Sequence, residues 1–88
     1  MNVNNKCVLV TGASRGIGKA IATEFAKNGA RVAFTYLSSI EKGQALEQEL
    51  GQFGNFCKGY RSDASDYVSA ENLINQVVED FGGVDVVI

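Results

Sequence analysis

The residues best suited to chemistry lie in one glycine-rich segment, residues 11–18, which reads TGASRGIG. Gly12 can make the tight turn that leaves a strand, Gly16 leaves room for a ligand beside the backbone, and Gly18 lets a following helix pack closely. The free N–H groups at the start of that helix would face a phosphate, assisted by the positive end of the helix dipole. The spacing therefore predicts a site for a dinucleotide pyrophosphate, with a plain strand-to-helix turn as the alternative.

The same segment differs from the phosphate-binding loop of kinases and ATPases. That loop has four residues between its glycines and continues with Gly-Lys-Ser/Thr. Here five residues separate Gly12 from Gly18, and Ala20 follows Lys19. The hydroxyl that would hold magnesium is absent, so the sequence favours a dinucleotide over ATP.

The segments around this loop alternate between strand and helix periodicities. Apolar runs predict four strands, over residues 6–10, 31–36, 55–61 and 84–88. Helical spacing predicts three helices: from Ile17 to a stop at Asn28 and Gly29, from a cap at Ser38 or Ser39 to about Gly54, and over about residues 66–81. Leu46, Leu50 and Phe53 would form the buried stripe of the second helix.

This alternation needs crossover connections, and hence a parallel sheet with helices on its faces. Right-handed crossovers give the strand order 3-2-1-4, with a ligand crevice between the first and fourth strands. We expect an α/β fold, the N-terminal half of a Rossmann-type doubly wound parallel sheet, truncated after the fourth strand. Residues 1–88 are expected to be the N-terminal part of a single dinucleotide-binding domain, because the apolar run 84–88 would otherwise leave an unprotected edge.

Composition excludes several classes of protein. Eight Lys and Arg against ten Asp and Glu leave a net charge of -2, so no nucleic-acid or anionic-membrane surface is expected. No apolar run approaches the roughly 18 residues that span a bilayer, and the first residues lack a signal-peptide core, so a cytoplasmic protein is expected. Without histidine, Cys–His catalytic pairs and mixed zinc sites are excluded, and no metal site is expected. Cys7 and Cys57 lie in apolar runs and are expected in the core.

The end of the second predicted strand bears on the choice of dinucleotide. An acid there would hydrogen-bond the ribose hydroxyls of NAD, but the residue is Tyr36. Arg15 can direct two N–H donors to a phosphate, and Ser38 or Ser39 can add a hydroxyl. The expected cofactor is therefore NADP(H). The alternatives are a solvated loop cation for Arg15 and helix capping for the serines.

A second polar position follows the third predicted strand. Asp63 could accept a hydrogen bond from an adenine amino group while the backbone of Ala64 lines the ring. A loop acid or a helix cap is the equal alternative for Asp63.

Four segments together resemble the short-chain dehydrogenase/reductase family. They are residues 8–22, 28–32, 62–66 and 81–88, and the similarity extends over essentially the whole chain. The Thr-Gly-x-x-x-Gly-x-Gly spacing, with Asp63 at the expected place, is typical of that family. Within it, the chain is most similar to the bacterial 3-oxoacyl-[acyl-carrier-protein] reductases.

The resemblance implies a homotetrameric NADPH-dependent oxidoreductase of fatty acid biosynthesis. Its hydride would go to the 3-keto group of a chain carried on acyl carrier protein, giving a 3-hydroxyacyl product. The cofactor-binding residues that the resemblance implies are Gly12, Ser14, Arg15, Gly16, Ile17 and Gly18 for the phosphates and ribose, and Asp63 and Ala64 for the adenine. Relatives often have Thr or a basic residue where this chain has Leu37, which moves the expected 2′-phosphate contact to Ser38.

The catalytic residues of the family are expected outside this chain. The next motif, Asn-Asn-Ala-Gly, would start after Ile88, and the serine, tyrosine and lysine of proton transfer come later still. The chain is therefore expected to be the cofactor-binding part of the enzyme, with no catalytic residue of its own. The alternatives are another member of the family such as an acetoacetyl-CoA reductase, a non-catalytic dinucleotide-binding module, and a non-binding remnant that persists only by associating with other subunits.

Overall fold

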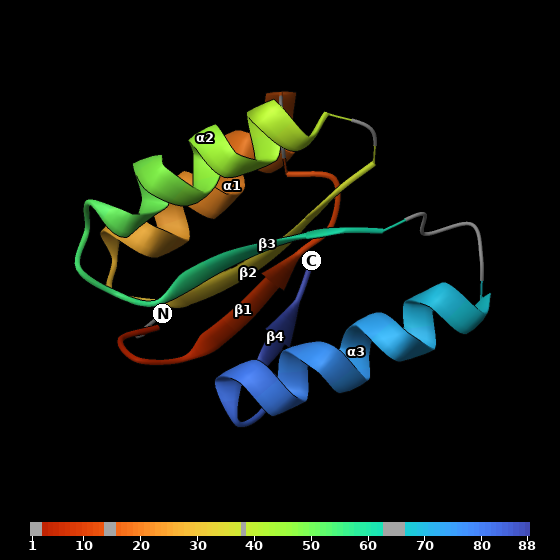
Figure 1. Ribbon diagram of the computed structural model, residues 1–88. Coiled ribbons are helices and arrows are strands. Elements are labelled where there is room, and N and C mark those ends of the chain that lie inside the picture. Colours follow the sequence, from red (N-terminus) through yellow and green to blue (C-terminus); the bar gives the residue numbers. More distant parts are fainter. Residues whose placement is uncertain (1–2, 14–15, 38, 63–66) are drawn as a thin grey trace.

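The computed structural model describes residues 3–13, 16–37, 39–62 and 67–88 (Figure 1). The elements formed by these residues are, in chain order, β1 (Cys7–Val10), α1 (Gly16–Lys27), β2 (Arg31–Tyr36), α2 (Ile40–Gly51), β3 (Cys57–Arg61), α3 (Tyr67–Phe81) and β4 (Val86–Val87). The strand pairings are parallel, and the order across the sheet is β3-β2-β1-β4. The predicted half of a Rossmann-type sheet is confirmed.

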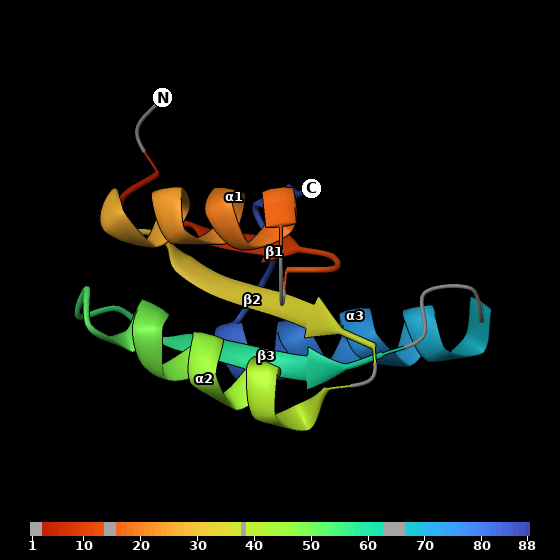
Figure 2. The ribbon, with the colours of Figure 1, turned by 90° about the horizontal axis from the view of Figure 1, so that it is seen from above.

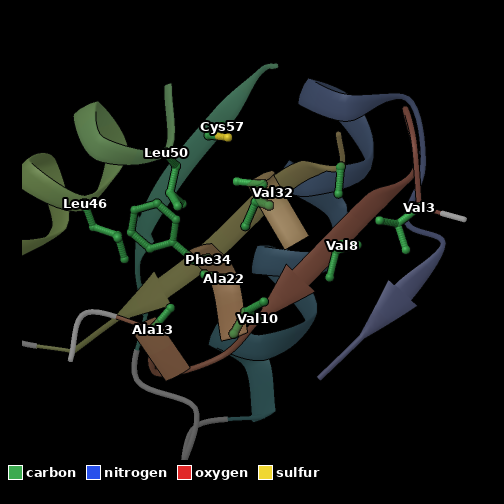
Figure 3. Packing of buried hydrophobic residues seen from close by; sticks show 12 residues of the cluster. Val3, Val8, Val10, Ala13, Ala22, Val32, Phe34, Leu46, Leu50 and Cys57 are labelled. Atoms are coloured by element: carbon green, nitrogen blue, oxygen red, sulfur yellow. The ribbon is translucent and has the colours of Figure 1, made fainter. Parts of the chain in front are cut away.

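The sheet is the middle of three layers, with α1 and α2 on one face and α3 on the other (Figures 1 and 2). All residues of β1 are buried, which is typical of a parallel strand covered on both faces. Val8 and Val10 point to the side of α1 and α2, whereas Cys7 and Leu9 point to α3, as the two-residue period of a strand requires. In Figure 3, Leu46 and Leu50 of α2 lie beside the Phe34 ring of β2.

The two cysteines lie where the sequence predicts them, in the core. Cys7 is fully buried and Cys57 nearly so, and both are free thiols. Burial raises the pKa of both thiols, so each is protonated at neutral pH and acts as a small apolar side chain.

Helix α1 ends at the predicted Asn28-Gly29 stop. Gly29 has a φ of +91°, its N–H donates to the Ala26 carbonyl at 3.1 Å, and the Ala30 N–H donates to the Phe25 carbonyl at 3.1 Å. These two bonds satisfy carbonyls that the helix leaves free and turn the chain into β2.

Helix α2 begins as predicted but ends earlier. Ser39 is its cap, since the Ser39 hydroxyl accepts a hydrogen bond from the Lys42 N–H at 3.2 Å. The predicted end near Gly54 and the predicted burial of Phe53 are both wrong. The helix ends at Gly51, and the chain then turns toward β3, which rotates the Phe53 ring off the buried stripe and leaves it 42% exposed.

Strands β3 and β4 are shorter than their predicted ranges, although the residues on both sides of β4 keep contact with β1. The Asp85 N–H donates to the Cys7 carbonyl at 2.9 Å, and the Asp85 carboxylate accepts from the Cys7 N–H at 2.9 Å. The Ile88 N–H donates to the Leu9 carbonyl at 2.8 Å. Within the described residues, no helix is long and apolar enough to cross a membrane.

Candidate functional site

The glycine-rich loop begins at the carboxyl end of β1, where the two neighbours of that strand are β2 and β4. The Thr11 N–H donates to the Ile88 carbonyl at 3.0 Å, and the Thr11 hydroxyl donates to the same oxygen at 3.1 Å. The loop is therefore tied to the chain after β4. This is the point at which crossovers leave the sheet in opposite directions, the usual ligand crevice of an open parallel sheet.

Strand β2 holds the other side of the loop through Thr35. The Gly12 N–H donates to the Thr35 hydroxyl at 2.9 Å, and the Ala13 N–H donates to the Thr35 carbonyl at 2.9 Å. Thr35 is only 4% exposed. The sequence prediction did not include Thr35. Its signal was a hydroxyl within an otherwise apolar strand, because a buried hydroxyl needs a hydrogen-bond partner.

The three glycines of the loop differ in what they require. Gly12 and Gly16 have φ values of +65° and +64°, in the left-handed region, and a Cβ atom at either would meet no atom of the described residues within 4 Å. A Cβ atom at Gly18 would overlap the Gly12 carbonyl oxygen and lie 3.0 Å from the Ala13 Cα. The left-handed backbone therefore favours glycine at Gly12 and Gly16, where a side chain would be strained although the space beside it is open. At Gly18, the close packing of α1 on the loop requires glycine instead.

The amino end of α1 lies at the same crevice. The helix is 12 residues long, and its first turn contains no acidic side chain. Ile17, in that turn, is 80% exposed. The open N–H groups and the positive end of the dipole can hold an anion there. Two further predicted residues of the loop, Ser14 and Arg15, lie outside the described residues.

The carboxyl ends of β2 and β3 meet beside this loop. The Ser62 N–H donates to the Tyr36 carbonyl at 3.0 Å, and the Arg61 Nε donates to the Leu37 carbonyl at 3.3 Å. The structure thus brings together the two strand ends that precede the predicted adenosine contacts. Those contacts, Ser38, Asp63 and Ala64, lie outside the described residues.

The same strand ends carry two features with no sequence prediction. Among the described residues, the Ser62 hydroxyl oxygen is buried without a hydrogen-bond partner. The ring of Tyr36 lies against Gly43 of α2, a buried position in the helix. The described residues contain no cluster of three His, Cys, Asp or Glu side chains that could hold a metal ion.

The family is decided by comparison with known proteins. Residues 6–88 match the family described as short chain dehydrogenase. The chain belongs to the short-chain dehydrogenase/reductase family. Its membership accounts for the sheet order and for the glycine spacing that the loop displays.

Individual relatives in the family differ in the reaction that their names state. The chain is 44% identical over 88 residues to an L-rhamnose 1-dehydrogenase (NAD(P)(+)) of Azotobacter vinelandii, covering 96% of this chain and 34% of that protein. It is 38% identical over 84 residues to the 3-oxoacyl-[acyl-carrier-protein] reductase FabG of Staphylococcus epidermidis, again covering 96% and 34%. The chain therefore spans about a third of the length of these relatives.

Solved structures match the fold described above. A short chain dehydrogenase from Burkholderia cenocepacia in complex with NADP has a TM-score of 0.94 at 40% identity, covering 99% of this chain and 36% of that chain. A blue fluorescent protein from a metagenomic library in complex with NADPH has a TM-score of 0.93 at 38% identity, with the same coverage.

Proposed function

We propose that the protein containing this chain is an NADPH-dependent oxidoreductase acting on a carbonyl/alcohol pair, and that residues 1–88 are the N-terminal part of its dinucleotide-binding domain. The observation that carries the proposal is the pair of left-handed glycines, Gly12 and Gly16, with open space beside them at the amino end of α1. Two solved structures that match this fold are complexes, the Burkholderia one with NADP and the metagenomic one with NADPH.

The roles of the loop residues follow from what each can offer to the cofactor. The first turn of α1 would bind the diphosphate through its backbone N–H groups. Thr35 would hold Gly12 and Ala13 in place, so that the loop leaves those helix N–H groups open to the cofactor. Ser14, Arg15, Gly16, Ile17 and Gly18 complete the proposed phosphate and ribose contacts. When bound, NADPH supplies the hydride.

The adenosine half of the cofactor would lie across the ends of β2 and β3. The absence of an acid at Tyr36 removes the group that would repel a 2′-phosphate, and Arg15 and Ser38 would bind that phosphate. Asp63 and Ala64 would contact the adenine. The Ser62 hydroxyl oxygen, which has no hydrogen-bond partner among the residues that the structure describes, adds a buried polar group at this end.

For the substrate, we propose a 3-oxoacyl chain carried on acyl carrier protein, in a cytoplasmic homotetramer of fatty acid biosynthesis. The support is the similarity to the 3-oxoacyl-[acyl-carrier-protein] reductases, at 38 to 39% identity. The residues that polarise the carbonyl and supply its proton would lie outside residues 1–88. A second candidate, oxidation of a sugar, is favoured by the 44% identity to the rhamnose dehydrogenase. Another reductase of the family, such as one acting on acetoacetyl-CoA, is a third.

Turnover by the intact natural protein separates these candidates. Purified protein is assayed with NADPH and acetoacetyl-acyl carrier protein, with NADPH and acetoacetyl-CoA, and with NADP and L-rhamnose. We expect the highest kcat/KM with the carrier-linked substrate. A higher kcat/KM with acetoacetyl-CoA or with L-rhamnose would replace the substrate proposal. Failure to bind NADP(H) at all would overturn the cofactor proposal as well.

A further inference from the structure

Gly43 lies inside α2, where glycine weakens a helix, and the residue it touches is Tyr36 at the end of β2. A Cβ atom at position 43 would lie 2.5 Å from Cε1, 2.6 Å from Cδ1 and 2.7 Å from Cζ of the Tyr36 ring. Those separations are shorter than any that a real side chain tolerates. The tyrosine ring therefore occupies the space that any other residue at position 43 would need.

The helix cannot easily move aside to relieve such a clash. It is capped by Ser39, and its Leu46 and Leu50 are fully buried in the core. The Glu47 carboxylate accepts a hydrogen bond from the Gly59 N–H of β3 at 3.0 Å. With α2 fixed at these points, a larger residue at position 43 would displace the Tyr36 ring.

The backbone of Tyr36 is also fixed, because its carbonyl accepts the Ser62 N–H of the neighbouring strand end. A displaced ring must then turn about its own side-chain bonds, away from α2 and outward from the strand end. That is the space in which the proposed function places the adenosine ribose. For a second glycine of the same helix, Gly51, no atom of the described part of the chain lies within 4 Å of the Cβ position.

We propose that Gly43 is a positioning residue for the adenosine end of the dinucleotide. By giving the Tyr36 ring a place on α2, it keeps that ring out of the ribose and 2′-phosphate space. The inference rests on the proposed NADP(H) site and extends it to a residue in the next helix. Gly43 itself would touch no part of the cofactor.

The test uses the intact natural protein and two probes, 2′,5′-ADP for the adenosine end and reduced nicotinamide mononucleotide for the other end. Gly43→Ala should lower the affinity for 2′,5′-ADP by roughly tenfold, which is about the effect of losing one hydrogen bond to a charged group. Binding of the nicotinamide probe should be unchanged. Gly51→Ala, the matched control in the same helix, should change neither affinity. Equal affinity of wild type and Gly43→Ala for 2′,5′-ADP would overturn the inference, and so would a parallel loss for both probes.

A second comparison keeps the inference testable if Gly43→Ala alone does not fold. Tyr36→Leu removes the ring, so adding Gly43→Ala to it should have no further effect on 2′,5′-ADP affinity. A further loss in the double variant would show that Gly43 does not act through Tyr36. The wild type tests the proposed function separately. If it binds neither NADPH nor 2′,5′-ADP, the cofactor proposal fails. If the wild type binds both and Gly43→Ala binds 2′,5′-ADP equally well, only the role of Gly43 is overturned.

Discussion

The N–H of Gly12 donates to the hydroxyl of Thr35 at 2.9 Å, so the glycine-rich loop after β1 is held by the neighbouring strand β2. Thr35 uses its carbonyl as well, which accepts the N–H of Ala13. One buried residue therefore fixes two consecutive peptide groups of the loop. Since these N–H groups are occupied within the protein, the first turn of α1 is left to bind phosphate.

Replacing Thr35 by Val should therefore affect both stability and cofactor binding. The Gly12 N–H would lose its acceptor in a partly buried site, which costs about 1 kcal/mol of unfolding free energy. Affinity for NADPH should fall because the loop loses its fixed shape. Urea unfolding and titration of NADPH fluorescence measure the two effects. Thr35→Ser keeps the hydroxyl and serves as the control; equal NADPH affinity for the Val and Ser variants would contradict the role of that hydroxyl.

Gly18→Ala should destabilise the protein through crowding. The new methyl group would overlap the Gly12 carbonyl oxygen, and overpacking of this kind typically costs about 1–3 kcal/mol. Gly51→Ala, which also places a methyl group on a helix, meets open space and should be neutral or slightly stabilising. Thermal unfolding of the two variants gives the comparison. A Gly18→Ala protein as stable as Gly51→Ala would show that α1 can withdraw from the loop at no cost.

The end of α2 shows where sequence periodicity fails. Leu46, Leu50 and Phe53 fit one helical stripe by spacing, but the helix ends at Gly51 and Phe53 leaves the stripe. Phe53→Ser should therefore change stability by less than about 0.5 kcal/mol, as for other exposed positions. Leu50→Ala should cost about 2–5 kcal/mol, because it leaves a cavity in the core. If Phe53→Ser lowered the free energy of unfolding as much as Leu50→Ala, Phe53 would belong to the buried stripe as the sequence predicted.

Local patterns predicted the elements and the helix starts because each depends on residues close in sequence, and the Asn28-Gly29 stop lies where it was predicted. The order 3-2-1-4 followed from a general rule, the right-handed crossover between parallel strands. Contacts between distant residues had no such signal. The contact of Thr35 with Gly12 and the contact of Tyr36 with Gly43 depend on which strand and helix become neighbours. Spacing within a single sequence does not specify that.

A polar cluster joins α3 to the edge strand β3 and should make stability depend on pH. The Asp80 carboxylate accepts hydrogen bonds from the Tyr60 hydroxyl at 2.7 Å, the Lys58 ammonium at 2.9 Å and the Gln76 amide at 3.1 Å. The Tyr60 hydroxyl, followed by the Lys58 ammonium, holds the pKa of Asp80 below its ordinary value of 3.8. Burial, followed by the Asp80 hydrogen bond, raises the pKa of Tyr60 well above its usual range.

Asp80→Asn should therefore lower the free energy of unfolding at neutral pH. Because the folded pKa of Asp80 is depressed, its contribution is fully present above pH 3.8 and is lost as pH falls through the lower, folded value. Urea unfolding from pH 7 to pH 3 should show that the difference in unfolding free energy between wild type and Asp80→Asn narrows only in acid. Glu49→Gln, which removes an exposed ion pair with Lys19, should cost little at any pH and is the control. A gap that stays constant down to pH 3 would rule out the depressed pKa.

A crystal structure of the intact protein grown with NADPH would show whether this loop and these strand ends hold NADP(H). We expect the diphosphate within hydrogen-bond distance of the first-turn N–H groups of α1, beside Gly16, with the adenosine across the ends of β2 and β3 and the Tyr36 ring still against Gly43. Electron density for the dinucleotide at any other place, with the loop at residues 11–18 free of it, would overturn the proposed cofactor site.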